Sequence, residues 1–151
     1  MKNEEMARLF SEATPYIQKY HGKTMVVKYG GNAMINEELK NAVMNDLVTL
    51  TLLGVRVVLV HGGGKHITAL LSRLHVPTRF ENGYRYTDQA VLDTAELALS
   101  AQVNKSIVQE LARQKVSAVG VSGKDGGRVA PKDKTKVEEA AILILALYNK
   151  F

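Results

Sequence analysis

Apolar and polar residues follow one another in blocks along the chain, and each block has the period of a helix or of a strand. Four stretches carry apolar residues three or four positions apart, which predicts amphipathic helices. Pro15, inside the first of them, predicts a kink or a split. The expected helices are residues 6–20, one capped by Asn36 and ended by Gly54, one from about Lys65 to Leu74, and one capped by Thr87 or Asp88 and reaching Leu111.

Between these helices lie three runs rich in valine and other aliphatic residues, which predict strands at 24–29, 55–60 and 117–121. Strands that alternate with helices imply parallel pairing and right-handed crossovers, so the fold class is α/β. Asn82-Gly83, between two short extended runs, predicts a β-hairpin. Residues 137–147 are aliphatic nearly all round a helix, and a further helix is expected there.

Each predicted strand runs into a turn rich in glycine: Gly30-Gly31, Gly62-Gly63-Gly64 and Gly123 to Gly127. The carboxyl ends of parallel strands share one edge of a sheet, where ligands bind. Glycine lets the backbone approach a ligand and point N–H groups at it, and a following helix N-terminus adds positive charge. Any one of these glycine turns, taken alone, is more readily interpreted as a tight turn without a ligand. Three together favour an anion site.

Two cations stand out beside these turns. Lys28 lies inside an apolar strand just before a glycine turn, where its charge could neutralise phosphate oxygens in a transition state. The alternative is a strand-end lysine that extends into solvent. Arg85 lies on the hairpin between two tyrosines, and a guanidinium can hold a carboxylate with two hydrogen bonds. A solvated strand arginine is an equally good interpretation.

The segment from His61 to Lys65 resembles two nucleotide motifs and matches neither. A P-loop needs Ser or Thr after Gly64-Lys65, and here His66 follows. The dinucleotide fingerprint needs a third glycine where Ile67 stands. No carboxylate or further histidine lies at zinc-ligand spacing, so His61 is interpreted as a structural, hydrogen-bonded histidine and no metal site is expected.

Composition and charge limit the kinds of protein and partner that the sequence allows. The 151 residues are 46% hydrophobic and 23% charged, which suits one globular domain. Without cysteine the chain has neither disulfides nor thiolate ligands. The net charge of +5 favours anionic partners, but the charges are spread along the chain and tryptophan is absent, so nucleic acid is not expected. No apolar run reaches membrane-spanning length and no signal peptide is visible, so a cytoplasmic protein without membrane partners is expected.

Five motifs in order carry a family resemblance: residues 28–34, 60–64, 83–88, 103–105 and 119–126. Together they resemble the N-terminal half of the acetylglutamate kinases, a branch of the amino acid kinase family, over about residues 23–129. The resemblance implies a three-layer αβα sandwich with a mostly parallel sheet, of which this chain would form the N-terminal lobe and a β-hairpin. It also implies transfer of the ATP γ-phosphoryl group to the side-chain carboxylate of N-acetyl-L-glutamate, a step of arginine biosynthesis.

The resemblance gives roles to particular residues. Lys28 would stabilise the transferring phosphoryl group and, with the backbone of Gly30 and Gly31, hold ATP phosphates. Gly63 and Gly64 would bind acetylglutamate through main-chain N–H groups, and Arg85 would bind a substrate carboxylate. ATP with Mg²⁺ would be a co-substrate, with no tightly bound cofactor.

Three segments are expected. Residues 1–22 form an N-terminal helix extension, which in similar arginine-inhibited members interlaces dimers into a homo-oligomer and contributes to an arginine site; the alternative is a helix packed on its own domain. Residues 23–130 form the acetylglutamate-binding lobe. Residues 131–151 form a basic and apolar tail without family motifs, so the ATP lobe is expected to be missing from a truncated chain. The chain is then an incomplete kinase, or a non-catalytic module that binds acetylglutamate or arginine or mediates oligomerisation.

Overall fold

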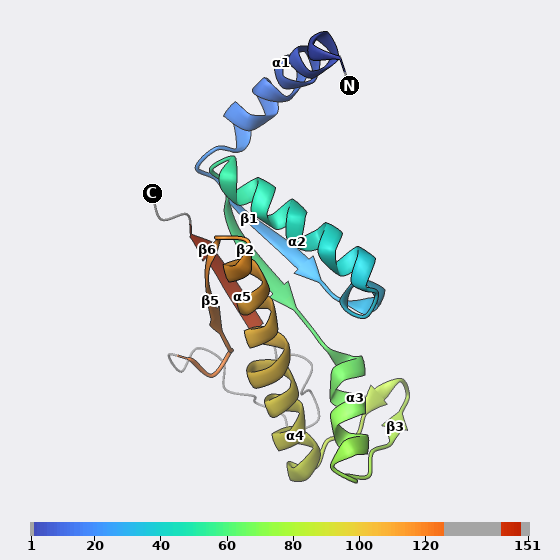
Figure 1. Ribbon diagram of the computed structural model, residues 1–151. Coiled ribbons are helices and arrows are strands. Elements are labelled where there is room, and N and C mark those ends of the chain that lie inside the picture. The colour runs from blue at the N-terminus through green and yellow to red at the C-terminus, as the bar shows by residue number, and fades with distance from the viewer. Residues whose placement is uncertain (1, 126–142, 149–151) are drawn as a thin grey trace.

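The fold is built on a four-stranded sheet, seen in a computed structural model that describes residues 2–125 and 143–148 (Figure 1). The strand order is β1-β2-β6-β5, and β1 pairs with β2 in parallel. Because β6 is antiparallel to both β2 and β5, the strands β1, β2 and β5 all point the same way, as predicted. The strands are β1 (Thr24–Tyr29), β2 (Arg56–His61), β5 (Ser117–Val121) and β6 (Leu143–Tyr148).

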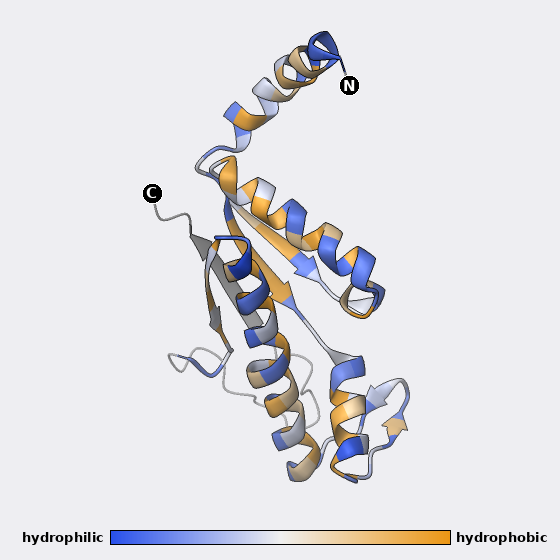
Figure 2. Cartoon of the chain, in the orientation of Figure 1, coloured by the Kyte–Doolittle hydropathy of each residue, from blue (hydrophilic) through white to orange (hydrophobic). Residues whose placement is uncertain are grey.

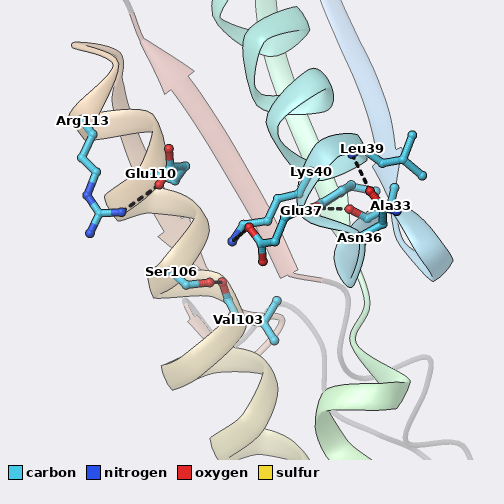
Figure 3. A network of polar contacts seen from close by, with 10 residues as sticks. Ala33, Asn36, Glu37, Leu39, Lys40, Val103, Ser106, Glu110 and Arg113 are labelled. Carbon is cyan, nitrogen blue, oxygen red and sulfur yellow. Dashed lines mark hydrogen bonds and ion pairs between the residues drawn. The ribbon is translucent and has the colours of Figure 1, made fainter.

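The helices and the hairpin lie close to their predicted places. Asp88, rather than Thr87, caps its helix, since its carboxylate accepts the Val91 N–H at 2.9 Å. Asn36 accepts the Leu39 N–H at 2.9 Å in the same way (Figure 3). The elements are α1 (Asn3–Tyr20), the 3₁₀ turn η1 (Gly31–Met34), α2 (Glu37–Leu52), α3 (Gly64–Arg73), β3 (Phe80–Glu81), β4 (Tyr84–Arg85), α4 (Gln89–Glu96), the π-helical turn η2 (Leu97–Val103) and α5 (Asn104–Arg113).

One face of the sheet carries the main core. Alternate residues of β2, such as Val57 and Leu59, are buried against Met44 of α2 and Leu111 of α5. Figure 2 shows β1 and β2 as largely apolar strands behind these two helices. Val26, on the opposite face of β1, is 67% exposed. The α/β class is therefore confirmed, while helices α2 and α5 form one of the two helical layers that a three-layer sandwich needs.

The long stretch from α4 to α5 buries all six residues of its predicted stripe, which stand four positions apart. On a regular helix such residues drift by about 40° at each step. This rotation lets one stripe face two partners: its first part packs against α3 and its last part packs against the sheet. The wider turn η2 lies between the two parts, and Ser106 Oγ donates to the Val103 carbonyl at its end, at 2.8 Å (Figure 3). The six residues are Val91, Ala95, Leu99, Val103, Ile107 and Leu111.

Two expectations about helices were wrong. The helix predicted over residues 137–147 is contradicted where it can be checked, because Leu143–Tyr148 is strand β6 and residues 137–142 lie outside the described residues. A short aliphatic run is equally typical of a strand in the middle of a sheet, and periodicity does not separate the two. The split predicted at Pro15 is absent, since α1 runs through it. Its exposed surface lets water satisfy the carbonyl that proline leaves unpaired.

Helix α1 buries none of its residues, and Phe10 is 70% exposed. In Figure 1 the helix extends away from the sheet and the other helices. The alternative in which this helix packs on its own domain is therefore wrong for the described part of the chain.

The core makes a paired stability prediction. Leu111 is fully buried and Leu52 is 61% exposed. Leu111→Ala should lower the free energy of unfolding by about 2–5 kcal/mol, because it leaves a cavity against the sheet. Leu52→Ala should change it by less than about 0.5 kcal/mol. Urea unfolding of both variants measures the difference, and equal losses would contradict this assignment of the core.

Candidate anion-binding site at the carboxyl edge of the sheet

The loops that follow β1 and β2 lie side by side. The parallel register places Tyr29 opposite His61, at the last residue of each strand. The Gly62 N–H donates to the Tyr29 carbonyl at 3.3 Å. Farther out, the Lys65 ammonium donates to Asn32 Oδ1 at 3.4 Å. These contacts fix the two glycine turns next to each other, as the parallel sheet predicts.

In the loop after β2 every carbonyl is paired, whereas two N–H groups are open. The Gly63 carbonyl accepts the Ile67 N–H at 2.9 Å, and the Gly64 carbonyl accepts the Thr68 hydroxyl at 3.0 Å. Within the described part of the chain, the N–H groups of Gly63 and Gly64 have no acceptor. Both lie at the N-terminus of α3, where the helix dipole favours negative charge. The loop therefore presents donors and no acceptors, as an anion site requires.

The loop after β1 also depends on glycine. Gly31 has a φ of +64°, in the left-handed region that glycine adopts without strain. A side chain added at Gly30 or Gly31 would meet no atom within 4 Å, so the backbone borders open space. Lys28 precedes this loop, is exposed, and its side chain has no hydrogen bond or ion pair with the described residues. It lies on the same face of β1 as Val26, away from α2 and α5.

Arg85 is anchored beside the first turn of α3. Its guanidinium donates to Thr78 Oγ1 at 2.8 Å and to Thr68 Oγ1 at 2.7 Å. The guanidinium carbon lies 4.6 Å from the centre of the Phe80 ring. Since Thr68 also donates to the Gly64 carbonyl, a chain of two hydrogen bonds joins Arg85 to the glycine loop. The side chain is therefore half-buried and held by three neighbours, while its role in binding a carboxylate stays a prediction.

The third glycine turn lies farther away. Val60 and Val121 both stand opposite Ile144, so one strand, β6, separates the loop after β5 from the loop after β2. Two strand spacings place the loops about 10 Å apart. In this turn the Lys124 ammonium is paired with Glu96. Residues 126 and 127 lie outside the described residues. Two of the three predicted turns therefore meet directly.

His61 lies under the loop after β2, as a buried histidine with hydrogen bonds at both ring nitrogens. Burial is the largest cause that lowers its pKa below the ordinary value, and the neighbouring His66 acts in the same direction. The prediction of a structural histidine is confirmed.

Three residues of this edge were missed from the sequence: Lys65, Thr68 and Thr78. Thr68 stands four residues after Gly64 on a predicted helix, and this spacing could have placed its hydroxyl on the Gly64 carbonyl. Nothing local to Thr78 indicates its contact with Arg85, which the hairpin creates.

Among the described residues, no three His, Asp or Glu side chains are grouped in a way that could hold a metal ion. The helices that the structure describes are also too short or too polar to cross a membrane.

An α/β sheet with glycine loops at the carboxyl ends of two adjacent parallel strands, a helix N-terminus and an anchored arginine is typical of a class of proteins that bind small anionic molecules at such an edge. A comparison of the sequence with models of known families identifies the family within that class. The model described as "Amino acid kinase family" matches residues 23–145, so the chain belongs to the amino acid kinase family.

The chain is similar to proteins named acetylglutamate kinase. One from Carboxydothermus hydrogenoformans is 45% identical over 130 residues, which are 86% of this chain and 44% of the relative. The chain spans less than half the length of the curated relatives it matches. The resemblance to the N-terminal half of such proteins is therefore confirmed.

Solved structures support the fold. The protein smu.665 from Streptococcus mutans UA159 matches with a TM-score of 0.54 and 29% identity, over 64% of this chain and 38% of that one. N-acetylglutamate synthase from Neisseria gonorrhoeae, complexed with coenzyme A and L-arginine, matches with a TM-score of 0.50 and 27% identity, over 69% of this chain and 23% of that one.

The buried imidazole predicts a loss of stability in acid. Because folding lowers the pKa of His61, the unfolded chain binds this proton more readily. The stabilising contribution is complete above the unfolded pKa of about 6.5 and is lost as the pH falls toward the folded value, by at most about 1.4 kcal/mol per pH unit. Urea unfolding between about pH 7.5 and pH 5 should show a smaller loss in His61→Gln than in the natural chain. The exposed His75→Gln is the control, and a loss equal in all three proteins would contradict the prediction.

The loop after β1 predicts a contrast between neighbouring glycines. Gly31→Ala should lower the free energy of unfolding by about 1–2 kcal/mol, because alanine resists a left-handed backbone. Gly30→Ala should be close to neutral, since its backbone is extended and nothing lies near the added methyl group. Thermal unfolding of the two variants measures the contrast, and a greater loss at Gly30 would overturn it.

Proposed function

We propose that this chain is the acetylglutamate-binding half of an acetylglutamate kinase, which phosphorylates the side-chain carboxylate of N-acetyl-L-glutamate with ATP. The observation that carries the proposal is the link from Arg85 through Thr68 to Gly64. It ties the Arg85 guanidinium to α3, the helix at whose start the Gly63 and Gly64 N–H groups are open, and N-acetyl-L-glutamate carries two carboxylates that need such donors. The similarity to acetylglutamate kinases supports this choice of acid.

The chemistry needs positioning and neutralisation of charge more than proton transfer. A carboxylate is already ionised near neutral pH, so its oxygen attacks the γ-phosphorus without a general base. The new C–O–P bond forms as the bond from the γ-phosphorus to the leaving ADP oxygen breaks, and the products are an acyl phosphate and ADP. Lys28 would stabilise the negative charge on the transferring group. Its exposure, and the lack of a hydrogen-bond or ion-pair partner for its ammonium among the described residues, support this role.

ATP would place its phosphates over the loop after β1. The backbone of Gly30 and Gly31 borders open space, which suits close approach of phosphate oxygens. Mg²⁺ would enter with the nucleotide as its counter-ion. The nucleotide base and ribose would be bound by a second half, because the chain spans under half of the similar kinases. Turnover is therefore proposed for this chain together with such a half.

A second candidate function is a binding or oligomerisation module without turnover. It is favoured by the similarity to a solved N-acetylglutamate synthase complexed with L-arginine, since that protein is not titled a kinase. In either case α1 would join copies of the chain into a homo-oligomer, because its apolar residues Leu9, Phe10 and Tyr16 are at least half exposed. Arginine binding would then be regulatory.

The two candidates are separated by completing the chain. Residues 1–125 of this protein would be joined to the corresponding second half of the Carboxydothermus hydrogenoformans kinase. Incubation with ATP, Mg²⁺, N-acetyl-L-glutamate and hydroxylamine should then give an acyl hydroxamate, and Lys28→Met in the same fusion should give far less. Absence of hydroxamate from a folded fusion that still binds the acid in calorimetry would favour the binding module.

Arg85 makes the sharpest prediction for substrate binding. Replacing it by alanine removes a charged partner of the acid, so the dissociation constant for N-acetyl-L-glutamate should rise roughly tenfold to a hundredfold. Arg79→Ala is the matched control, since Arg79 lies on the same hairpin and pairs with Glu81 instead. Isothermal titration of the natural chain and both variants measures the change. Unchanged affinity in Arg85→Ala would remove Arg85 from the site.

A further inference from the structure

The motif Val103-Asn104-Lys105 was singled out in the sequence, yet the binding site described above does not use it. Asn104 is 1% exposed and lies at the start of α5. Its Nδ2 lies 3.3 Å from His61 Nε2. On the other side of the ring, His61 Nδ1 lies 3.0 Å from the Gly62 carbonyl. One buried line of contacts therefore runs from α5 through His61 to the glycine loop.

The direction of these hydrogen bonds follows from the carbonyl. The Gly62 oxygen can only accept, so His61 Nδ1 must carry the proton. A neutral imidazole then leaves Nε2 as an acceptor, which requires the NH₂ group of Asn104 to face it. Asn104 thus supports this tautomer of His61, because its NH₂ group donates to the ring nitrogen that carries no proton.

The Gly62 carbonyl and the Gly63 N–H belong to one planar peptide unit and point in opposite directions. Holding the carbonyl toward His61 therefore aims the Gly63 N–H away from it, and that N–H has no acceptor among the described residues. The same peptide is supported from the helix, since a methyl group added at Gly63 would lie 2.6 Å from Leu99 Cδ2. A side chain at this position would therefore displace Leu99 or the loop.

The other end of the contact is also fixed. A side chain added at Gly120 would lie 1.9 Å from Asn104 Oδ1, so β5 approaches the amide at a distance that only glycine allows. The Lys105 ammonium donates to the Gly120 carbonyl at 2.9 Å. Asn104 is therefore packed between β5 and His61, and among the described residues the contact to His61 is the one hydrogen bond of its amide, since its Oδ1 has no partner.

We propose that Asn104 and His61 are positioning residues that aim the Gly63 N–H at the acid substrate by fixing the peptide between Gly62 and Gly63. This inference rests on the proposed function, because it takes that N–H as a contact of the acid. Neither residue touches the substrate. Their effect is on the affinity for the acid, and it acts through the hydrogen bonds at the two nitrogens of the His61 ring.

The first test uses the natural chain labelled with ¹⁵N. Long-range ¹H–¹⁵N spectra near neutral pH should show His61 neutral with its proton on Nδ1. Addition of N-acetyl-L-glutamate should shift the Gly63 amide resonance. A proton on Nε2, or a Gly63 resonance that does not move while the acid binds, would overturn the proposal.

The second test uses Asn104→Leu, which keeps the branched shape and removes the donor. The Nε2 resonance of His61 should shift, because this nitrogen loses its donor while Nδ1 keeps its proton on the Gly62 carbonyl. The dissociation constant for N-acetyl-L-glutamate should rise roughly fivefold or more. Asn41→Leu on the exposed side of α2 is the control and should change neither. Weaker binding with unchanged His61 ring resonances would contradict the mechanism. If Asn104→Leu does not fold, the spectra of the natural chain decide the question.

A failure of the proposed function is distinguishable from a failure of this inference. If the natural chain binds no N-acetyl-L-glutamate by calorimetry, the proposed substrate is wrong, and so is the role of the Gly63 N–H. If the natural chain binds the acid and Asn104→Leu binds it equally well, the substrate stands and only the positioning pair is wrong.

Discussion

The pairing of β1 with β2 is the contact on which the site depends. The two strands end in register at Tyr29 and His61, and the Gly62 N–H continues the ladder by one further hydrogen bond to the Tyr29 carbonyl. A shift of one residue would turn every side chain of a strand to the other face and would separate the two glycine loops. Burial of Val57 and Leu59 against the helices holds this register.

The helical segment from Leu99 to Lys105 supports the same edge from below. Its apolar side chains lie close to Gly63, and its polar Asn104 lies close to Gly120. Glycine is required at both positions because there is no space for a side chain. In most turns glycine is chosen for its backbone freedom. Glycine therefore has two roles in this chain: backbone freedom in turns, and the lack of a side chain at close contacts. The second role lets the loop after β2 and strand β5 approach the same helical segment.

Much of this arrangement could be predicted from local patterns. The Asn-Gly turn, the Asn36 cap and the four-residue spacing of the apolar stripe on α4 and α5 depend on residues close together in sequence, and each was predicted. The strand β6 was predicted as helix because a short aliphatic run has no period that separates the two. The partners of Arg85 were missed because Thr68 and Thr78 reach it only when the hairpin folds over α3.

The sequence by itself determined the family, the order of elements up to β5 and the residue types at the edge, since motifs and periodicity are local properties of the chain. The tertiary structure decided which of these residues meet. It joined two glycine loops and left the third one strand away, it anchored Arg85, and it buried Asn104 against His61. These outcomes depend on register and packing between segments far apart along the chain, which no local pattern encodes.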